Sequence, residues 1–139
     1  MTYRAHYMLA AWLMTKKSYV LAEREYLRAL ELFPHDPFVP YNLGQEYFAA
    51  GLYEPAFRMY ARAQSIMPEF QDVEARMALT LAVQGRYPEA RHLAVRALRR
   101  GVGDVSTMRA ILTAAALDER SRRRLAGRIA AAPAPVVAR

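Results

Sequence analysis

Residues 51–68, GLYEPAFRMYARAQSIMP, have the pattern of one amphipathic helix with a defined start and a defined end. Gly51 tolerates the left-handed backbone conformation in which helices commonly terminate, so it separates this segment from the preceding one. Small Ala residues then recur at helical spacing, which lets a neighbouring helix approach closely. Pro68 cannot continue a helix and closes the segment. The stretch therefore predicts the second half of a helical hairpin.

The same pattern occurs three times, at an interval of 34 residues. The equivalent sets are Tyr19, Tyr53 and Tyr87; Ala22, Ala56 and Ala90; Ala29, Ala63 and Ala97; and Pro34 and Pro68. Gly51 aligns with Gly85, whereas the equivalent position upstream is Lys17. A fixed period of this length indicates stacked helical hairpins, each of which buries its apolar face against its neighbours.

The period and its large and small positions resemble the tetratricopeptide repeat over about residues 3–102. The resemblance implies an all-α, right-handed α-solenoid of antiparallel helix pairs. The expected helices are Tyr3–Thr15, Tyr19–Leu32, Pro37–Ala50, Tyr53–Met67, Gln71–Gln84 and Tyr87–Arg100. One domain, residues 1–132, would hold repeats at about 3–36, 37–70 and 71–103 and a degenerate fourth pair at 104–132. A Pro/Ala-rich tail would follow at 133–139.

The fourth pair is predicted from a weaker signal than the three repeats. Asp104 is a candidate N-cap for a helix that would run to about Leu117, and a second helix would run from Glu119 to about Ala131. Arg124 and Arg128 replace the small and aromatic residues of the repeat. The pair is therefore interpreted as a cap that ends the stack with a polar outer face.

The composition limits the class of protein and the cellular compartment that can be expected. The absence of cysteine from the 139 residues excludes a disulfide framework and thiolate chemistry. The longest apolar run near the N-terminus, residues 7–14, is too short to span a bilayer and has no cleavage site after it. A cytoplasmic protein is expected. The Arg- and Ala-rich composition is typical of a GC-rich genome, and a bacterial protein is expected.

The resemblance implies that the first helix of each pair lines a concave groove holding a peptide or helix of a partner protein. By position, the groove residues are Arg4, Tyr7, Met8, Ala11, Met14, Phe38, Tyr41, Asn42, Gln45, Phe48, Asp72, Arg76 and Leu79. The expected apolar anchors are Tyr7, Met14, Tyr41 and Phe48. The residues expected to set the register are Asn42, Gln45 and Arg76. Alternatively, several of these side chains pack on one another or on the C-terminal pair.

A partly apolar ligand is expected rather than an acidic one. Co-chaperone repeats that bind acidic chaperone tails use five positions filled by Lys, Asn, Asn, Lys and Arg. The corresponding residues here are Tyr7, Ala11, Asn42, Asp72 and Arg76. Only Asn42 and Arg76 match, and Asp72 would repel the carboxylates of the ligand. The sequence therefore argues against such a carboxylate clamp.

A second candidate surface lies at the N-terminal end of the stack. Tyr3, Leu9 and Trp12 would crowd on the face that normally meets a preceding repeat. An exposed aromatic face of this kind predicts either self-association or a missing upstream segment, and self-association makes a homo-oligomer the alternative function. The competing interpretation is that N-terminal residues cover this face, or that Trp12 is half-buried.

A third candidate surface is the cluster of C-terminal arginines. Residues 85–139 hold 12 Arg against 4 Asp and Glu, and Arg120, Arg124 and Arg128 share one helix face. A basic adaptor that contacts RNA or an anionic membrane is possible on this charge alone. The favoured interpretation is a solvated face of the cap, because no aromatic residue follows Tyr87 to stack on bases.

The sequence contains no recognisable catalytic or cofactor-binding pattern. His6, His35 and His92 do not share the spacing of metal ligands on one helix face, and no Gly-rich phosphate loop is present. We therefore expect no enzymatic activity and no cofactor. The expected partner is a protein or peptide, with neither nucleic acid nor anionic membrane favoured.

Overall fold

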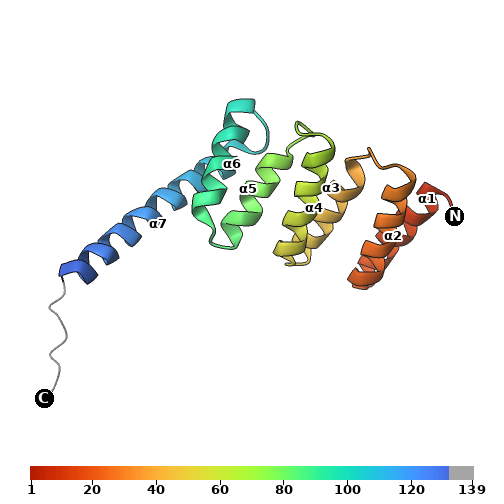
Figure 1. Cartoon of the computed structure of the whole chain (residues 1–139), viewed down its shortest axis with the longest axis horizontal. Coiled ribbons are helices and arrows are strands. Elements are labelled where there is room, and N and C mark those ends of the chain that lie inside the picture. Colours follow the sequence, from red (N-terminus) through yellow and green to blue (C-terminus); the bar gives the residue numbers. More distant parts are fainter. Residues whose placement is uncertain (132–139) are drawn as a thin grey trace, which may run out of the picture.

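The computed structural model describes residues 1–131, and seven helices with no strand make up this part of the chain (Figure 1). The helices are α1 Tyr3–Thr15, α2 Tyr19–Leu32, α3 Phe38–Ala49, α4 Tyr53–Ile66, α5 Val73–Val83, α6 Tyr87–Arg100 and α7 Val105–Ala131. The first six form three hairpins stacked side by side along one direction. The all-α class and the three helix pairs expected from the 34-residue period are thus confirmed.

The three hairpins turn by the same local geometry. Lys17, Gly51 and Gly85 all have positive φ, at 58°, 77° and 75°. The next amide in each hairpin donates to a carbonyl five residues earlier: Ser18 to Leu13 at 3.0 Å, Leu52 to Tyr47 at 2.9 Å and Arg86 to Leu81 at 2.9 Å. This bond closes a helix C-terminus around a left-handed residue. The aligned positions in the sequence therefore have one structural role, which Lys17 fills despite its side chain.

Small residues at the helix crossings allow the tight packing of each pair. Nine Ala residues are fully buried, at positions 10, 22, 29, 56, 63, 78, 90, 94 and 97. Tyr26 and Tyr60 fill the space beside them and are almost fully buried. The core forms two apolar clusters, one in α1–α4 and the start of α5, the other in α5–α7. Phe57 and Leu93 pack against both clusters.

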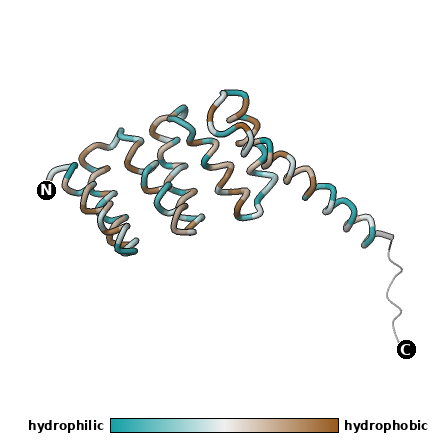
Figure 2. Tube along the Cα trace, turned by 180° about the vertical axis from the view of Figure 1, so that it is seen from behind, coloured by the Kyte–Doolittle hydropathy of each residue, from teal (hydrophilic) through white to brown (hydrophobic). Residues whose placement is uncertain are grey.

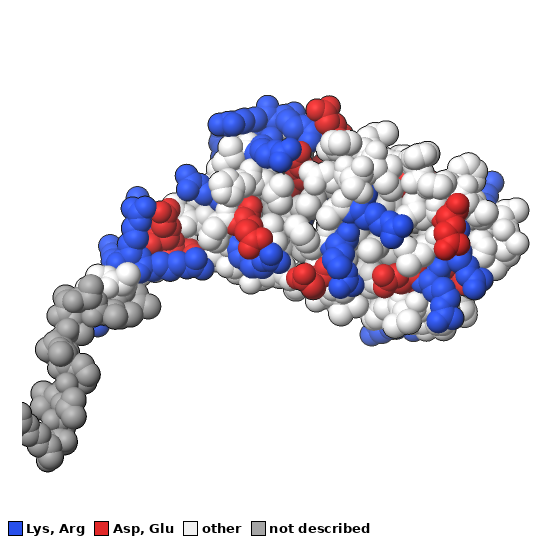
Figure 3. Space-filling view, in the orientation of Figure 1, with Lys and Arg blue, Asp and Glu red and all other residues white. Residues whose placement is uncertain are grey.

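The predicted fourth helix pair is wrong, because α7 is one continuous helix of 27 residues. A second hairpin would need a left-handed residue at position 119, which is 34 residues after Gly85. Glu119 stands there and stays helical, where it pairs with Arg123, while Asp118 pairs with Arg122. The helix therefore runs on past α6 and projects from the stack (Figure 1). Its projecting half is mostly hydrophilic (Figure 2), and blue cationic side chains cover much of it (Figure 3).

None of the helices within residues 1–131 combines the length and the hydropathy needed to cross a membrane. The expected tail, residues 133–139, lies outside the described residues. The division into repeats at 3–36, 37–70 and 71–103 and a cap at 104–132 stays a prediction.

Candidate functional site on the first helices

Helices α1, α3 and α5 present one continuous face, which we call the first-helix face. Hydrogen bonds between successive repeats join these helices. The Asn42 side-chain amide on α3 donates to the Tyr7 hydroxyl on α1 at 2.5 Å. The Tyr41 hydroxyl on α3 donates to Asp72, which directly precedes α5, also at 2.5 Å. All of the predicted groove residues belong to α1, α3 or the segment 72–79. That they line a groove together stays a prediction.

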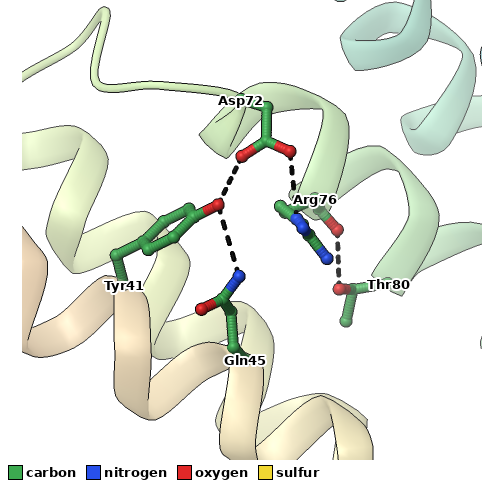
Figure 4. Close-up of polar contacts among 5 residues, drawn as sticks. All are labelled: Tyr41, Gln45, Asp72, Arg76 and Thr80. Carbon is green, nitrogen blue, oxygen red and sulfur yellow. Dashed lines mark hydrogen bonds and ion pairs between the residues drawn. The ribbon is translucent and has the colours of Figure 1, made fainter. Parts of the chain in front are cut away.

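A polar network occupies the middle of the first-helix face (Figure 4). Asp72 Oδ1 accepts a hydrogen bond from the Tyr41 hydroxyl. Asp72 Oδ2 forms an ion pair with Arg76 Nε at 3.1 Å. Gln45 Nε2 lies 3.4 Å from the Tyr41 hydroxyl. Burial, together with the hydrogen bond to Asp72, raises the pKa of Tyr41 above its ordinary value. Tyr41 therefore stays a neutral donor, and Asp72 offsets the charge of Arg76.

Two of the four predicted apolar anchors are buried and cannot present surface to a ligand. Met14 is 6% exposed and Tyr41 is 5% exposed. The Tyr41 ring packs against Phe70 and Tyr60, with centroids 5.3 and 5.9 Å away. Phe70 lies in the loop between α4 and α5, and Tyr60 lies in α4. Tyr41 is therefore a core residue, and only its hydroxyl reaches the polar network.

Apolar surface remains accessible elsewhere on the first-helix face. Met8 on α1 is 65% exposed, and Ala11, one turn further on, is also exposed. Phe38 is exposed at the edge, where its ring meets Phe70 edge-on at 4.8 Å. Of the other predicted residues, Arg4 is exposed, and those half-buried are Tyr7, Asn42, Gln45, Phe48, Asp72, Arg76 and Leu79. Along this face, exposed apolar patches therefore alternate with polar groups that hydrogen-bond to one another.

The C-terminal end of this face contains a pocket of about 230 Å³ that the sequence did not indicate. Asp72, Ala75, Arg76 and Leu79 form one wall. Residues that the sequence analysis missed form the other: Gly103, Asp104, Thr107 and Met108. Gly103 is the sequence feature that could have indicated these residues. Its φ is +77°, and a Cβ built on it would lie 2.3 Å from the Ala75 Cβ, so the turn before α7 approaches α5 closely.

The predicted aromatic patch at the N-terminal end is only partly formed. Trp12 is 55% exposed, with Lys16 Nζ 5.7 Å from its ring centroid. Tyr3 instead packs edge-on against Phe33 at 4.9 Å, and its hydroxyl donates to Asp36 at 2.5 Å. Leu9 is half-buried. The prediction that Tyr3 crowds beside Trp12 is therefore wrong, because the turn between α2 and α3 provides Tyr3 with an aromatic and a carboxylate partner.

One buried pair of titratable side chains lies inside the first hairpin. His6 Nδ1 lies 2.6 Å from Glu25 Oε2 inside the first hairpin. Within residues 1–131, no three His, Cys, Asp or Glu side chains cluster closely enough to hold a metal ion.

Several solved structures resemble this chain, although no protein-family model matches its sequence and no curated protein is similar to it. The Sgt2 TPR domain from Aspergillus fumigatus is 23% identical, with a TM-score of 0.60, 98% of this chain covered and 88% of that one. The first TPR of Spaghetti (RPAP3), bound to the HSP90 peptide SRMEEVD, is 14% identical, with a TM-score of 0.66 and coverages of 84% and 92%. The Yersinia enterocolitica type III secretion chaperone SycD, in complex with a peptide of the translocator YopD, is 19% identical, with a TM-score of 0.67 and coverages of 84% and 93%.

Proposed function

We propose that this chain, which has the tetratricopeptide-repeat fold, is a protein–protein interaction module that holds a peptide or helix of a partner on its first-helix face. The observation that carries the proposal is the continuity of that face, where hydrogen bonds join α1, α3 and α5 and apolar surface stays exposed at Met8. Two structures of the same fold were solved with a peptide bound, which supports this use of the fold.

The chemistry of the face favours a ligand with few charges. Asp72 places a carboxylate in the middle of the face, and its ion pair with Arg76 offsets that cation. Asn42 is similarly engaged with Tyr7. In the middle of this face an acidic tail would therefore meet only Arg76, a cation that is already paired, while the exposed Arg4 lies on α1 at the N-terminal end. Met8 and Leu79 offer apolar contacts to side chains of an extended peptide.

A peptide selection with matched variants tests this proposal. Random peptides displayed on phage would be selected on the wild-type chain, and the best one measured by fluorescence anisotropy. Met8→Asp/Leu79→Asp should weaken its binding by about tenfold or more, since both substitutions place charge against an apolar ligand. Val20→Asp/Leu21→Asp puts the same charges on exposed apolar positions of α2 and should leave affinity unchanged. The acidic peptide SRMEEVD should not bind at concentrations that saturate the selected peptide.

Equal weakening by both variants would contradict the proposal, because it would place the site away from the first-helix face. Saturable binding of SRMEEVD would contradict the preference for a ligand of low charge. Both variants must give the wild-type circular dichroism spectrum before their affinities are compared.

Self-association through α1 is a second candidate function. Met8 and Trp12 lie four residues apart on α1 and are both largely exposed, so they form one apolar patch at the open end of the stack. Light scattering of the wild type should then give more than the mass of one chain, and Trp12→Glu should reduce it to one chain. A monomeric wild type across the accessible concentration range would eliminate this candidate.

A further inference from the structure

The projecting end of α7 concentrates positive charge away from the rest of the molecule. Arg120, Arg122, Arg123, Arg124 and Arg128 are all exposed. Glu119 is the last acidic residue of the sequence, so no acidic side chain follows it. Blue cationic side chains gather on the part of α7 that extends beyond α6, with red acidic side chains among them (Figures 1 and 3). Because the predicted cap pair does not form, these arginines are not the outer face of a packed helix.

The arginines point to more than one side of the helix. Residues in an α-helix are rotated by about 100° from one to the next. Arg120, Arg124 and Arg128 therefore lie within about 80° of one another, opposite the side on which Met108, Ile111 and Ala115 are buried. Arg122 lies about 160° from Arg120, on the opposite side of the helix.

Three of these arginines have no compensating charge in the described part of the chain. Arg122 and Arg123 pair with Asp118 and Glu119 at 3.0 and 2.5 Å. Within residues 1–131, Arg120, Arg124 and Arg128 make no ion pair. Like charges four residues apart destabilise a helix. An anionic ligand along this stripe would remove that repulsion and stabilise the projecting helix.

We propose that the projecting end of α7 binds the phosphate backbone of double-stranded DNA by entering its major groove. A helix of about 10–12 Å diameter matches a major groove about 12 Å wide. A groove has phosphates on both walls. Arg120, Arg124 and Arg128 would contact the phosphates of one wall. Arg122 and Arg123 would reach the other by exchanging Asp118 and Glu119 for phosphate. The cations of this segment are all arginines and not lysines, and a guanidinium group can pair with phosphate through two parallel hydrogen bonds.

Other anionic ligands fit these residues less well. The major groove of an RNA duplex is too narrow for side chains to read. Single strands are bound through aromatic stacking, and no aromatic residue follows Tyr87. Helices that lie in a membrane surface have a broad apolar side, whereas residues 120–131 contain only two large apolar residues, Leu125 and Ile129.

The test measures binding of a fluorescent mixed-sequence DNA duplex by anisotropy between about 50 and 200 mM KCl. Arg120→Ala/Arg124→Ala/Arg128→Ala should weaken binding by about tenfold or more and should flatten the slope of log K against log salt by about 3. Alanine favours helix, so α7 should keep its circular dichroism signal. Arg24→Ala/Arg28→Ala/Arg62→Ala removes the same charge from α2 and α4 and should change neither the affinity nor the slope.

Three outcomes would overturn the proposal. The first is an equal loss in both triple variants, which would mean that total charge alone matters. The second is tighter binding to an RNA duplex, to phosphatidylserine vesicles or to polyglutamate than to DNA. The third concerns Ser121→Pro, which keeps every arginine but interrupts the helix. If this variant binds DNA like wild type, an intact helix in the groove is not the mode of binding.

Discussion

At the scale of single residues, Gly44 sets how closely α3 and α4 approach. A Cβ at this position would lie 2.8 Å from two ring carbons of Tyr60, which is almost fully buried and cannot move away freely. We expect Gly44→Ala to lower the free energy of unfolding by about 1–3 kcal/mol, as overpacking of a core does. Urea denaturation followed by circular dichroism would measure it.

The same substitution at Gly127 is the matched control. Gly127 lies inside α7, and a Cβ there meets nothing within 4 Å. Gly127→Ala should therefore be neutral or stabilising by up to about 1 kcal/mol, because Ala is the better helix former. A Gly44→Ala variant as stable as wild type would show that α3 and α4 can separate, against the tight crossing described above.

Glu74 is the most buried acidic residue of the described chain, and two arginines compensate it. Its Oε1 accepts from Arg100 at 3.0 Å and from Arg96 at 3.2 Å. The Glu74 side chain is 2% exposed, and Arg100 is less exposed than Arg96. We expect Arg100→Ala to destabilise by about 2 kcal/mol and Arg96→Ala by less, since an exposed ion pair contributes little.

The double variant tests whether the two arginines act on one charge. Removing both leaves a buried carboxylate without a partner, which costs about 3–5 kcal/mol and should exceed the sum of the single effects. Chemical denaturation of the four proteins gives this double-mutant cycle. Additive effects would mean that the two arginines act independently of each other rather than on one shared charge.

The sequence predicts which helix a residue belongs to better than how deeply the residue is buried. The 34-residue register correctly brought Tyr41 and Met14 to the helices that form the first-helix face. It could not predict their burial, because the depth of Tyr41 depends on the rings of Phe70 and Tyr60, which lie in other elements. Tyr3 shows the same limit, since its partners Phe33 and Asp36 come from a turn.

At the scale of helices, the start of α7 was predictable and its length was not. Asp104 caps the helix as expected, with its carboxylate accepting from the Thr107 amide at 2.7 Å. A cap is a local signal that a few residues contain. The predicted break near residue 118 instead relied on extending the period, in a segment without Gly or Pro to enforce it. At the position equivalent to Gly51 and Gly85 stands Glu119, which stays helical and pairs with Arg123.

The cap also makes the stability of α7 depend on pH. Hydrogen bonds from the Thr107 hydroxyl and amide, and from the Ser106 hydroxyl, hold the pKa of Asp104 below its ordinary value. A carboxyl group whose pKa is lower in the folded state stabilises the fold at pH values above its unfolded pKa. This stabilisation is lost as the pH falls through the folded pKa. Asp104→Ala should therefore lower Tm at about pH 7, and the difference from wild type should shrink towards about pH 2.

Asp104→Asn is the control for this prediction, because Asn can cap a helix without titrating. Its Tm should lie near that of wild type at neutral pH, and its difference from Asp104→Ala should not depend on pH. A gap between wild type and Asp104→Ala that stays constant down to low pH would show that the ionised carboxylate does not contribute through its charge.

At the scale of the whole molecule, the two core clusters are joined by few side chains. Phe57 on α4 and Leu93 on α6 each pack against both clusters. In a stack of repeats, cooperativity depends on the interfaces between neighbours. Phe57→Ala/Leu93→Ala should therefore weaken the coupling of the two halves as well as their stability. We expect urea unfolding to become broader, with a lower m-value or two separate transitions.

Leu30→Ala distinguishes lost coupling from lost stability. Leu30 is buried inside the first cluster and does not contact the second. Its truncation should destabilise by about 2–4 kcal/mol and move the midpoint while keeping one steep transition. A single steep transition in Phe57→Ala/Leu93→Ala as well would mean that backbone and ion-pair contacts between α4, α5 and α6 suffice to couple the halves. A broadened transition in the double variant alone would locate the cooperative link in two side chains that bridge the second and third repeats.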